Sequence, residues 1–180
     1  MPRVEDLNPE NLTPEQKAVH ARIAGTRGGV VRGPFAIWLR NPSIAEAADR
    51  LGTTLRQSPL DKRLFELMVL IVARHWSAQY EWFVHARHAL EVGVSPDAVE
   101  AIRHGRKPEF ARDDERLVYD LVTEMNETRT LSQPTYDRAI AALGLDRTIE
   151  LITALGFYTM VAIMLNGFDA PVPGGERPLP

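Results

Sequence analysis

Four pairs of residues, each a helix-capping side chain directly before a proline, constrain the fold most strongly. The pairs are Thr13-Pro14, Asn41-Pro42, Ser58-Pro59 and Ser95-Pro96. The side-chain oxygen of Ser, Thr or Asn accepts a hydrogen bond from a free backbone N–H in the first turn of a helix. Proline suits the first helical position because no N–H is needed there. The sequence therefore predicts a helix start at each pair.

Between these starts, apolar residues recur every three or four positions, as they do on the buried face of a helix. No stretch alternates apolar and polar residues over the length of a strand. The predicted helices span residues 14–24, 42–56, 59–77, 79–92, 96–104, 112–128, 133–143 and 147–167. We therefore predict an all-α fold.

Length and composition predict one domain over residues 1–170, because the 180 residues are 44% hydrophobic. A Pro/Gly-rich tail at 171–180 follows, and its prolines favour an extended strip without helix, either loose or lying across a neighbouring subunit. The chain has no cysteine, which excludes a thiol nucleophile, a dithiol redox centre and thiolate metal ligands.

Charge and hydropathy exclude two classes of partner. The net charge of −3 argues against a nucleic-acid partner, which calls for a basic surface. The longest apolar run, residues 67–73, is far shorter than the roughly 20 residues of a membrane span. We expect no membrane partner, and a start without an apolar signal stretch favours the cytoplasm.

The residues best suited to chemistry lie in the segment 79–88. In a helix that starts with this segment, Glu81, His85 and His88 share one face. A carboxylate beside an imidazole can fix its tautomer and raise its basicity, so such a pair can exchange protons near neutral pH. Glu66 stands alone in the apolar run of the preceding helix, where a charge is costly without a partner. If the two helices fold back on each other, Glu66 reaches the same face.

A wider set of residues resembles the signature of the carboxymuconolactone decarboxylase family, which includes the alkylhydroperoxidase D-like (AhpD-like) proteins. The set comprises Glu66, Arg74, Tyr80-Glu81-Trp82, His85, Ala89 and Gly93-Val94-Ser95, with outer matches at Gly33-Pro34-Phe35, Asn41-Pro42, Tyr158, Val161 and Asn166. The resemblance implies an AhpD-like helical bundle with a central antiparallel helix pair. It also implies a homo-oligomer, commonly a trimer or hexamer.

The chain departs from the peroxidase branch of that family at two cysteine positions. The resemblance places the glutamate and histidine of that branch at Glu66 and His85, but Ala78 and Glu81 stand where its cysteines would be. A thiol peroxidase needs one thiolate to attack the peroxide and a second sulfur to resolve the product. We therefore expect no thiol peroxidase activity, while the decarboxylase branch leaves Glu81 and His85 as acid–base groups.

We expect a lyase or isomerase that acts by proton transfer on a small anionic compound, either carboxylated or lactone-type, without a metal or another cofactor. Such an enzyme holds the carboxylate, stabilises an enolate and returns a proton to carbon. His85 is the expected proton donor, Glu81 its orienting partner or the alternate acid, and Glu66 a support behind them. The expected substrate-binding residues are Arg27 and Arg32 of the glycine-rich loop 26–35 as carboxylate anchors, with Tyr80, Trp82 and His75 at the pocket.

Two other hypotheses stay open. Glu66, Glu81, His85 and His88 are all competent metal ligands, although no paired Glu-x-x-His motif and no His-Glu-x-x-His motif is present. The alternative is a non-catalytic protein of the same fold that binds a small ligand or serves assembly. A Glu–His pair at helical spacing also occurs on solvated helices without any function.

Overall fold

The computed structural model describes residues 2–180, and no β-strand occurs within that range. The predicted all-α class is therefore confirmed. Contacts within the chain form two compact units, one of residues up to 58 with 164–171, the other of residues 59–163 with 172–180. The single domain expected over 1–170 stays a prediction, because a division by contacts does not show whether the units fold separately.

The first unit contains three α-helices and one 3-10 turn. They are the turn Pro9–Asn11 and the helices α1 (Pro14–Thr26), α2 (Pro34–Trp38) and α3 (Pro42–Arg56). Thr13 and Asn41 accept the expected capping bonds from the backbone N–H groups of Gln16 and Ile44. The short α2 was not expected, since its residues lie at the end of the glycine-rich loop.

Ion pairs and aromatic contacts hold this unit together. Arg22 pairs with Glu46 at 2.6 Å, and Arg27 pairs with the buried Asp49 at 3.1 Å, so both pairs join α1 or its end to α3. The Arg27 guanidinium also lies 3.9 Å from the ring centre of Phe35 in α2. These contacts explain how the glycine-rich loop is held against α3.

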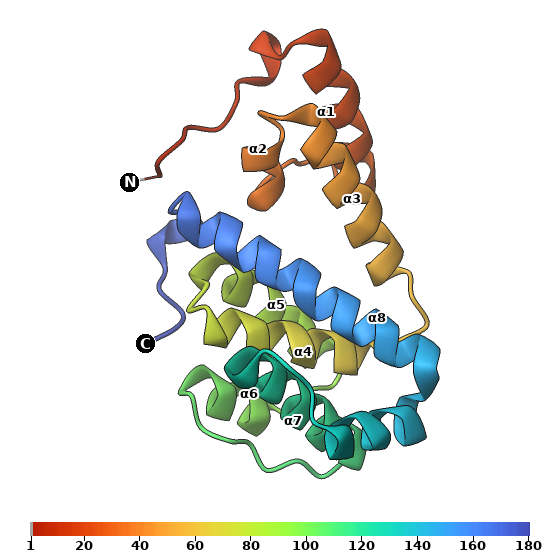
Figure 1. The fold of residues 1–180 in the computed structure, drawn as a ribbon. Helices are drawn as coiled ribbons and strands as arrows, with labels where there is room; N and C mark the ends of the chain where they lie inside the picture. The colour runs from red at the N-terminus through yellow and green to blue at the C-terminus, as the bar shows by residue number, and fades with distance from the viewer. Residues whose placement is uncertain (1) are drawn as a thin grey trace. The chain divides into compact units, whose positions relative to one another are not determined.

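The second unit is built around α4 (Figure 1). Its helices are α4 (Lys62–His75), α5 (Gln79–Glu91), α6 (Pro96–Arg103), α7 (Asp113–Thr128) and α8 (Gln133–Gly167), whose last residues belong to the first unit. The apolar run that predicted a buried helix is buried, and α4 packs against α5, α6 and α7. The start expected at Ser58-Pro59 is wrong by three residues, because the Asp61 side chain accepts from Arg63 N–H and caps α4.

Arg63 joins α4 to α7 through two carboxylates. Its guanidinium lies 2.7 Å from Asp114 and 2.7 Å from Glu115, and the side chains of Arg63 and Glu115 are only 9% and 8% exposed. Burial acts to raise the pKa of Asp114, but hydrogen bonds from Arg112 and Arg63 outweigh it and lower that pKa to about 2. The acidic residues at the start of α7 therefore bind Arg63 of α4 as well as interacting favourably with the helix dipole.

Gly144 interrupts α8. Its φ of 79° and ψ of 168° are not helical, and the Thr148 hydroxyl donates to the Gly144 carbonyl at 2.7 Å where the helix resumes. The two predicted helices, 133–143 and 147–167, are thus confirmed as the two arms of α8. By length and composition α8 is apolar enough to cross a membrane, but half of its most apolar window is buried within the structure, as in many core helices. This is weak support for a membrane span.

The C-terminal tail packs against its own chain, which corrects the expectation of a strip that is loose or on a neighbouring subunit. The Gln79 amide donates to the Leu179 carbonyl at 3.2 Å and accepts from Leu179 N–H at 2.9 Å. Arg103 donates to the carbonyl of Pro178, and the Leu179 side chain is buried. Residues Pro173–Gly175 also form a short 3-10 turn, although Gly174 and Gly175 adopt positive φ, which is not helical.

Candidate active site

Glu66 and His85 form a close pair between α4 and α5. His85 Nδ1 lies 2.7 Å from Glu66 Oε2, and the two side chains are 16% and 15% exposed. An ionised carboxylate can only accept a hydrogen bond, so the Nδ1–H group of His85 donates this hydrogen bond to Glu66. The other ring nitrogen of the neutral histidine, Nε2, is then the atom that can accept a proton from a substrate.

Tyr158 of α8 packs edge-on against His85. Their ring centres are 5.1 Å apart with the planes at 87°, and Tyr158 meets Phe65 of α4 in the same manner at 5.5 Å. The aromatic ring therefore limits the orientations open to the imidazole. The sequence prediction did not include Tyr158 in the site. The one signal for it was its place in the outer part of the family pattern, but its contact with His85 depends on tertiary packing.

Glu81 lies one helical turn before His85 on α5, and it is almost completely buried. Neither of its carboxyl oxygens has a hydrogen-bond partner among the described residues. Burial without a partner raises the pKa of Glu81 well above its usual value, because the charged form loses its hydration. Burial therefore favours the protonated, neutral form of the Glu81 carboxyl over its charged form.

The expected roles of the two glutamates change with this geometry. Glu81 was expected to orient His85, with Glu66 as a support behind the pair. In the structure, Glu66 rather than Glu81 contacts the imidazole of His85. The other predicted role of Glu81, that of an alternate acid, stays a prediction; the burial that raises its pKa is consistent with it.

The structure separates other predicted residues from this pair. His75 is exposed and lines a different cavity, which Glu66, Glu81 and His85 do not line. Trp82 is buried, and Tyr80 is partly buried on α5. The part of these three residues in substrate binding stays a prediction.

Arg27 and Arg32, the predicted carboxylate anchors, belong to the first unit. Arg27 is engaged there by Asp49 and by the ring of Phe35. Arg32 is exposed in the loop that precedes α2. Their role toward a substrate at His85 stays a prediction.

The hypothesis of a metal site gains no support from the geometry. Within residues 2–180, no group of three or more His, Asp or Glu side chains is arranged to hold a metal ion. His88 lies 3.2 Å from Glu91 and is occupied by that contact.

Residues 42–110 match the sequence model of the carboxymuconolactone decarboxylase family. This segment belongs to that family. The family segment includes Glu66, Glu81 and His85 but ends before α7, so Tyr158 lies outside it. No curated protein sequence matches the chain.

Solved structures share the fold over most of the chain. A peroxidase-related protein from Silicibacter sp. TM1040 is 17% identical, with a TM-score of 0.76, over 99% of this chain and 95% of that one. A protein of unknown function from Agrobacterium tumefaciens, with the suggested name antioxidant defence protein AhpD, is 15% identical over 76% and 95%, with a TM-score of 0.69. The debrominase Bmp8, in complex with 2,3,4-tribromopyrrole, is 15% identical over 97% and 92%, with a TM-score of 0.72. These similarities confirm an AhpD-like fold for the carboxymuconolactone decarboxylase family segment and its surroundings.

Proposed function

We propose that the protein is a cofactor-free lyase or isomerase that moves protons on a small carboxylated or lactone-type compound. The observation that carries this proposal is the 2.7 Å contact between His85 and Glu66, in a partly desolvated position against Tyr158. A histidine held in one tautomer by a carboxylate is a good general base, and its protonated form is a good general acid.

In the proposed reaction, the C–C bond to the carboxylate breaks, and its electron pair enters a conjugated carbonyl to give an enolate and carbon dioxide. Protonated His85 then returns a proton to carbon, and Glu66 stabilises the imidazolium before that transfer. An isomerisation needs the same groups: His85 Nε2 removes a proton from one carbon, and the imidazolium returns it to another. Both reactions balance without an electron donor or acceptor.

Glu81 is the second proton source in this proposal. Burial raises its pKa and so favours the protonated form, which can donate a hydrogen bond or a proton to an oxygen that gains charge as the enolate forms. A charged carboxylate in that place would instead repel the developing negative charge. The absence of cysteine from the chain removes the thiol chemistry of a peroxidase.

The substrate class follows from this chemistry and from the comparisons. An enolate needs a carbonyl conjugated with the bond that breaks, which favours small unsaturated acids and lactones. The Bmp8 complex supports a small ring compound as a ligand for this fold. We therefore propose a small anionic substrate.

The test is the exchange of carbon-bound hydrogen in D2O. A set of small unsaturated carboxylates and lactones is incubated with the protein, and NMR follows deuterium at carbon and loss of the carboxyl group. We expect His85→Asn and Glu66→Gln to slow exchange by about 100-fold or more, the usual contribution of a general acid or base. His104→Asn is the matched control, because His104 is exposed on the surface and pairs with Glu100.

Exchange at the wild-type rate in His85→Asn would contradict the assigned role. If the wild-type protein exchanges no compound, while an aromatic acid raises its melting temperature, the non-catalytic alternative is favoured. Circular dichroism of each variant shows whether the helices are retained.

We also propose that α4 and α5 form the central antiparallel pair of a homo-oligomer. The three-residue link Trp76–Ala78 between them supports the antiparallel direction. An apolar stripe on α8 supports assembly with further copies. Its members are Leu145, Ile149, Met160 and Ile163, each between 39% and 55% exposed, and helical spacing places them along one side.

A further inference from the structure

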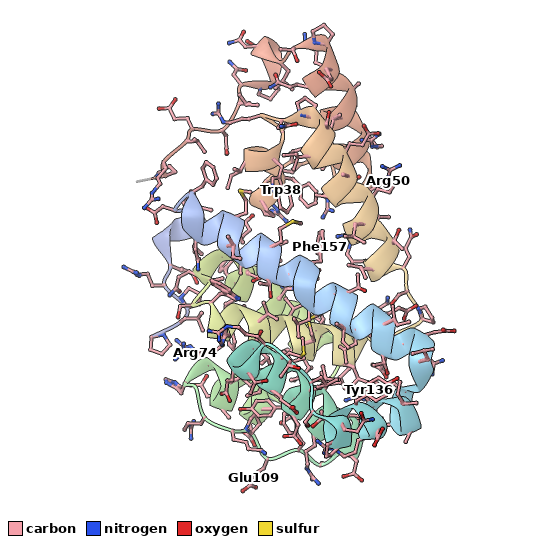
Figure 2. The ribbon with its side chains drawn as sticks, viewed as in Figure 1. Trp38, Arg50, Arg74, Glu109, Tyr136 and Phe157 are labelled. Carbon is pink, nitrogen blue, oxygen red and sulfur yellow. The ribbon has the colours of Figure 1, made fainter. Side chains whose placement is uncertain are left out.

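A cavity of about 110 Å³ lies at the end of α4, beside α6 and α7. Figure 2 labels Arg74, which lines it. Arg74 follows Glu66 by eight residues, or about 12 Å along the helix axis at 1.5 Å per residue. The cavity is therefore a separate place from the acid–base pair, and the proposed function makes no use of it.

The Arg74 guanidinium presents an edge without an acceptor. Its Nε is buried and has no hydrogen-bond partner among the described residues. Within residues 2–180, the hydrogen bond of this side chain joins Nη1 to the Ser77 hydroxyl at 3.5 Å, which is long for such a bond. The Nε and Nη2 groups together form the fork that binds a carboxylate through two parallel bonds.

Gly105 makes room for this guanidinium. Its φ is +67°, and a Cβ at this position would lie 3.2 Å from Arg74 Nη2. A side chain there would be strained by the backbone and crowded by the guanidinium. Glycine therefore leaves the Nη2 side of Arg74 open at the cavity wall.

Asn126 supplies a second unmatched donor to the same cavity. Its Nδ2 is buried and has no partner among the described residues. A buried donor without an acceptor destabilises the protein, so two of them in one cavity indicate a missing ligand with oxygen acceptors. Ile71 and Ile102 line the same cavity with apolar atoms.

The charges at the cavity also favour an anion. Arg74 and Arg106 line it against a single carboxylate, Glu127, which is exposed. The ends of α4 and α6 contribute about half a negative charge each. These partial charges weaken the attraction, so we expect affinity in the millimolar range.

We propose that this cavity binds a small aliphatic monocarboxylate, with the carboxylate at Arg74 and Asn126 and the hydrocarbon at the two isoleucines. The planar fork of Arg74 matches a carboxylate. A volume of about 110 Å³ equals that of roughly three or four water molecules, which suits an acid of two to four carbons. The apolar wall distinguishes such an acid from inorganic phosphate, which has no hydrocarbon to bury.

The test is calorimetric titration of the full-length protein with propionate, and with propionamide and inorganic phosphate as comparison ligands. We expect propionate to bind at least about 10-fold more tightly than either. Arg74→Lys keeps the charge but loses the fork, and it should weaken propionate binding about 10-fold or more. Arg87→Lys is the matched control, because Arg87 is exposed on α5 and pairs with Glu91.

Asn126→Asp provides a second test that does not depend on loss of structure. The new carboxylate has nearly the shape of the amide and can pair with Arg74 in place of the ligand. We expect this variant to lose propionate binding and to unfold at a higher temperature than the wild type.

Three results would overturn the proposal. One is that no propionate binds at millimolar concentration, which would leave water as the occupant. Another is that phosphate binds more tightly than propionate. The third is that Arg74→Lys and Asn126→Asp bind propionate as the wild type does.

Discussion

At the scale of single residues, Glu81 is the side chain whose environment conflicts most with its chemistry. A carboxyl group in an unfolded chain has a pKa of about 4.3, whereas burial raises the pKa of Glu81 in the folded state. Below pH 4 both states are protonated. As the pH rises above that value, the unfolded chain releases this proton while the folded protein keeps it until its own pKa is passed. This residue therefore makes the protein less stable as the pH rises.

We predict that Glu81→Gln removes this loss of stability at higher pH, because glutamine has nearly the same shape as glutamate and does not ionise. The free energy of unfolding of the variant should exceed that of the wild type by a margin that grows as the pH rises from about 5 until the raised pKa of Glu81 in the folded protein is passed. The margin grows by at most about 1.4 kcal/mol per pH unit. Urea denaturation across this range measures it.

Glu91→Gln is the control for this prediction, because Glu91 is exposed on the same helix. Its effect on stability should not increase with pH in the same way. A margin for Glu81→Gln that does not change between pH 5 and 8 would mean that Glu81 is ionised in the folded protein.

At the scale of elements, Arg63 links α4 to α7 through its ion pairs with Asp114 and Glu115. Replacing it with Met leaves the buried Glu115 without its cation, so we predict a loss of about 3–5 kcal/mol in the free energy of unfolding. Arg87→Met breaks only the exposed pair with Glu91 and should cost less than about 1 kcal/mol. Urea denaturation at neutral pH compares the two, and equal losses would contradict the role of Arg63.

The same contact predicts a dependence on acid. The pKa of Asp114 is about 2 in the folded protein, below the value of about 3.9 in an unfolded chain. Its stabilisation is therefore present above pH 4 and is lost as the pH falls toward 2. In Arg63→Met this loss should be smaller, because one of the two arginines that lower the pKa is gone. Acid unfolding followed by circular dichroism measures the difference.

Gly144 sets the break between the arms of α8. Its φ of 79° and ψ of 168° lie in a region that only glycine adopts without strain, so we predict that Gly144→Ala destabilises the protein by about 1–3 kcal/mol. Gly156→Ala is the matched comparison. Gly156 is helical, and a Cβ at its position would meet no neighbouring atom within 4 Å, so alanine there should stabilise the helix by about 0.5–1 kcal/mol. Thermal unfolding of both variants should give shifts of opposite sign.

The helices could be predicted from the sequence because their signals are local. Thr13 and Asn41 cap helices where expected, and Gly144 ends one arm of α8. The error at Ser58 arose because Asp61 offers a competing cap three residues later. Helix α2 was missed because it is too short to show periodicity.

The site could be predicted only in part. Helical spacing places Glu81 one turn before His85 on α5, and the lone charge of Glu66 indicated that it needs a partner. Which glutamate contacts the imidazole depends on how α4 and α5 pack, and spacing within one helix carries no such information. Tyr158 and the docked tail required contacts between distant parts of the chain.

At the scale of the whole molecule, the apolar stripe of α8 leads to a prediction about assembly. We predict that the protein is a homo-oligomer and that Ile149→Lys with Ile163→Lys shifts it toward the monomer, because both side chains are about half exposed. Val30→Lys is the matched control, since Val30 is 50% exposed in a loop outside α8. Light scattering after size-exclusion chromatography gives the mass of each. A wild-type monomer would contradict the prediction.

The number of residues between two contacting groups also predicts the order in which the contacts form during folding. Glu66 and His85 are 19 residues apart, whereas the bonds between Gln79 and Leu179 close a loop of 100 residues. Longer loops cost more chain entropy to close, and contacts between distant residues slow folding. We therefore expect α4 and α5 to bring the acid–base pair together early, before Tyr158 reaches His85 and before the tail reaches the start of α5. In the late steps of folding, Tyr158 would then restrict the orientation of His85 after His85 has already paired with Glu66.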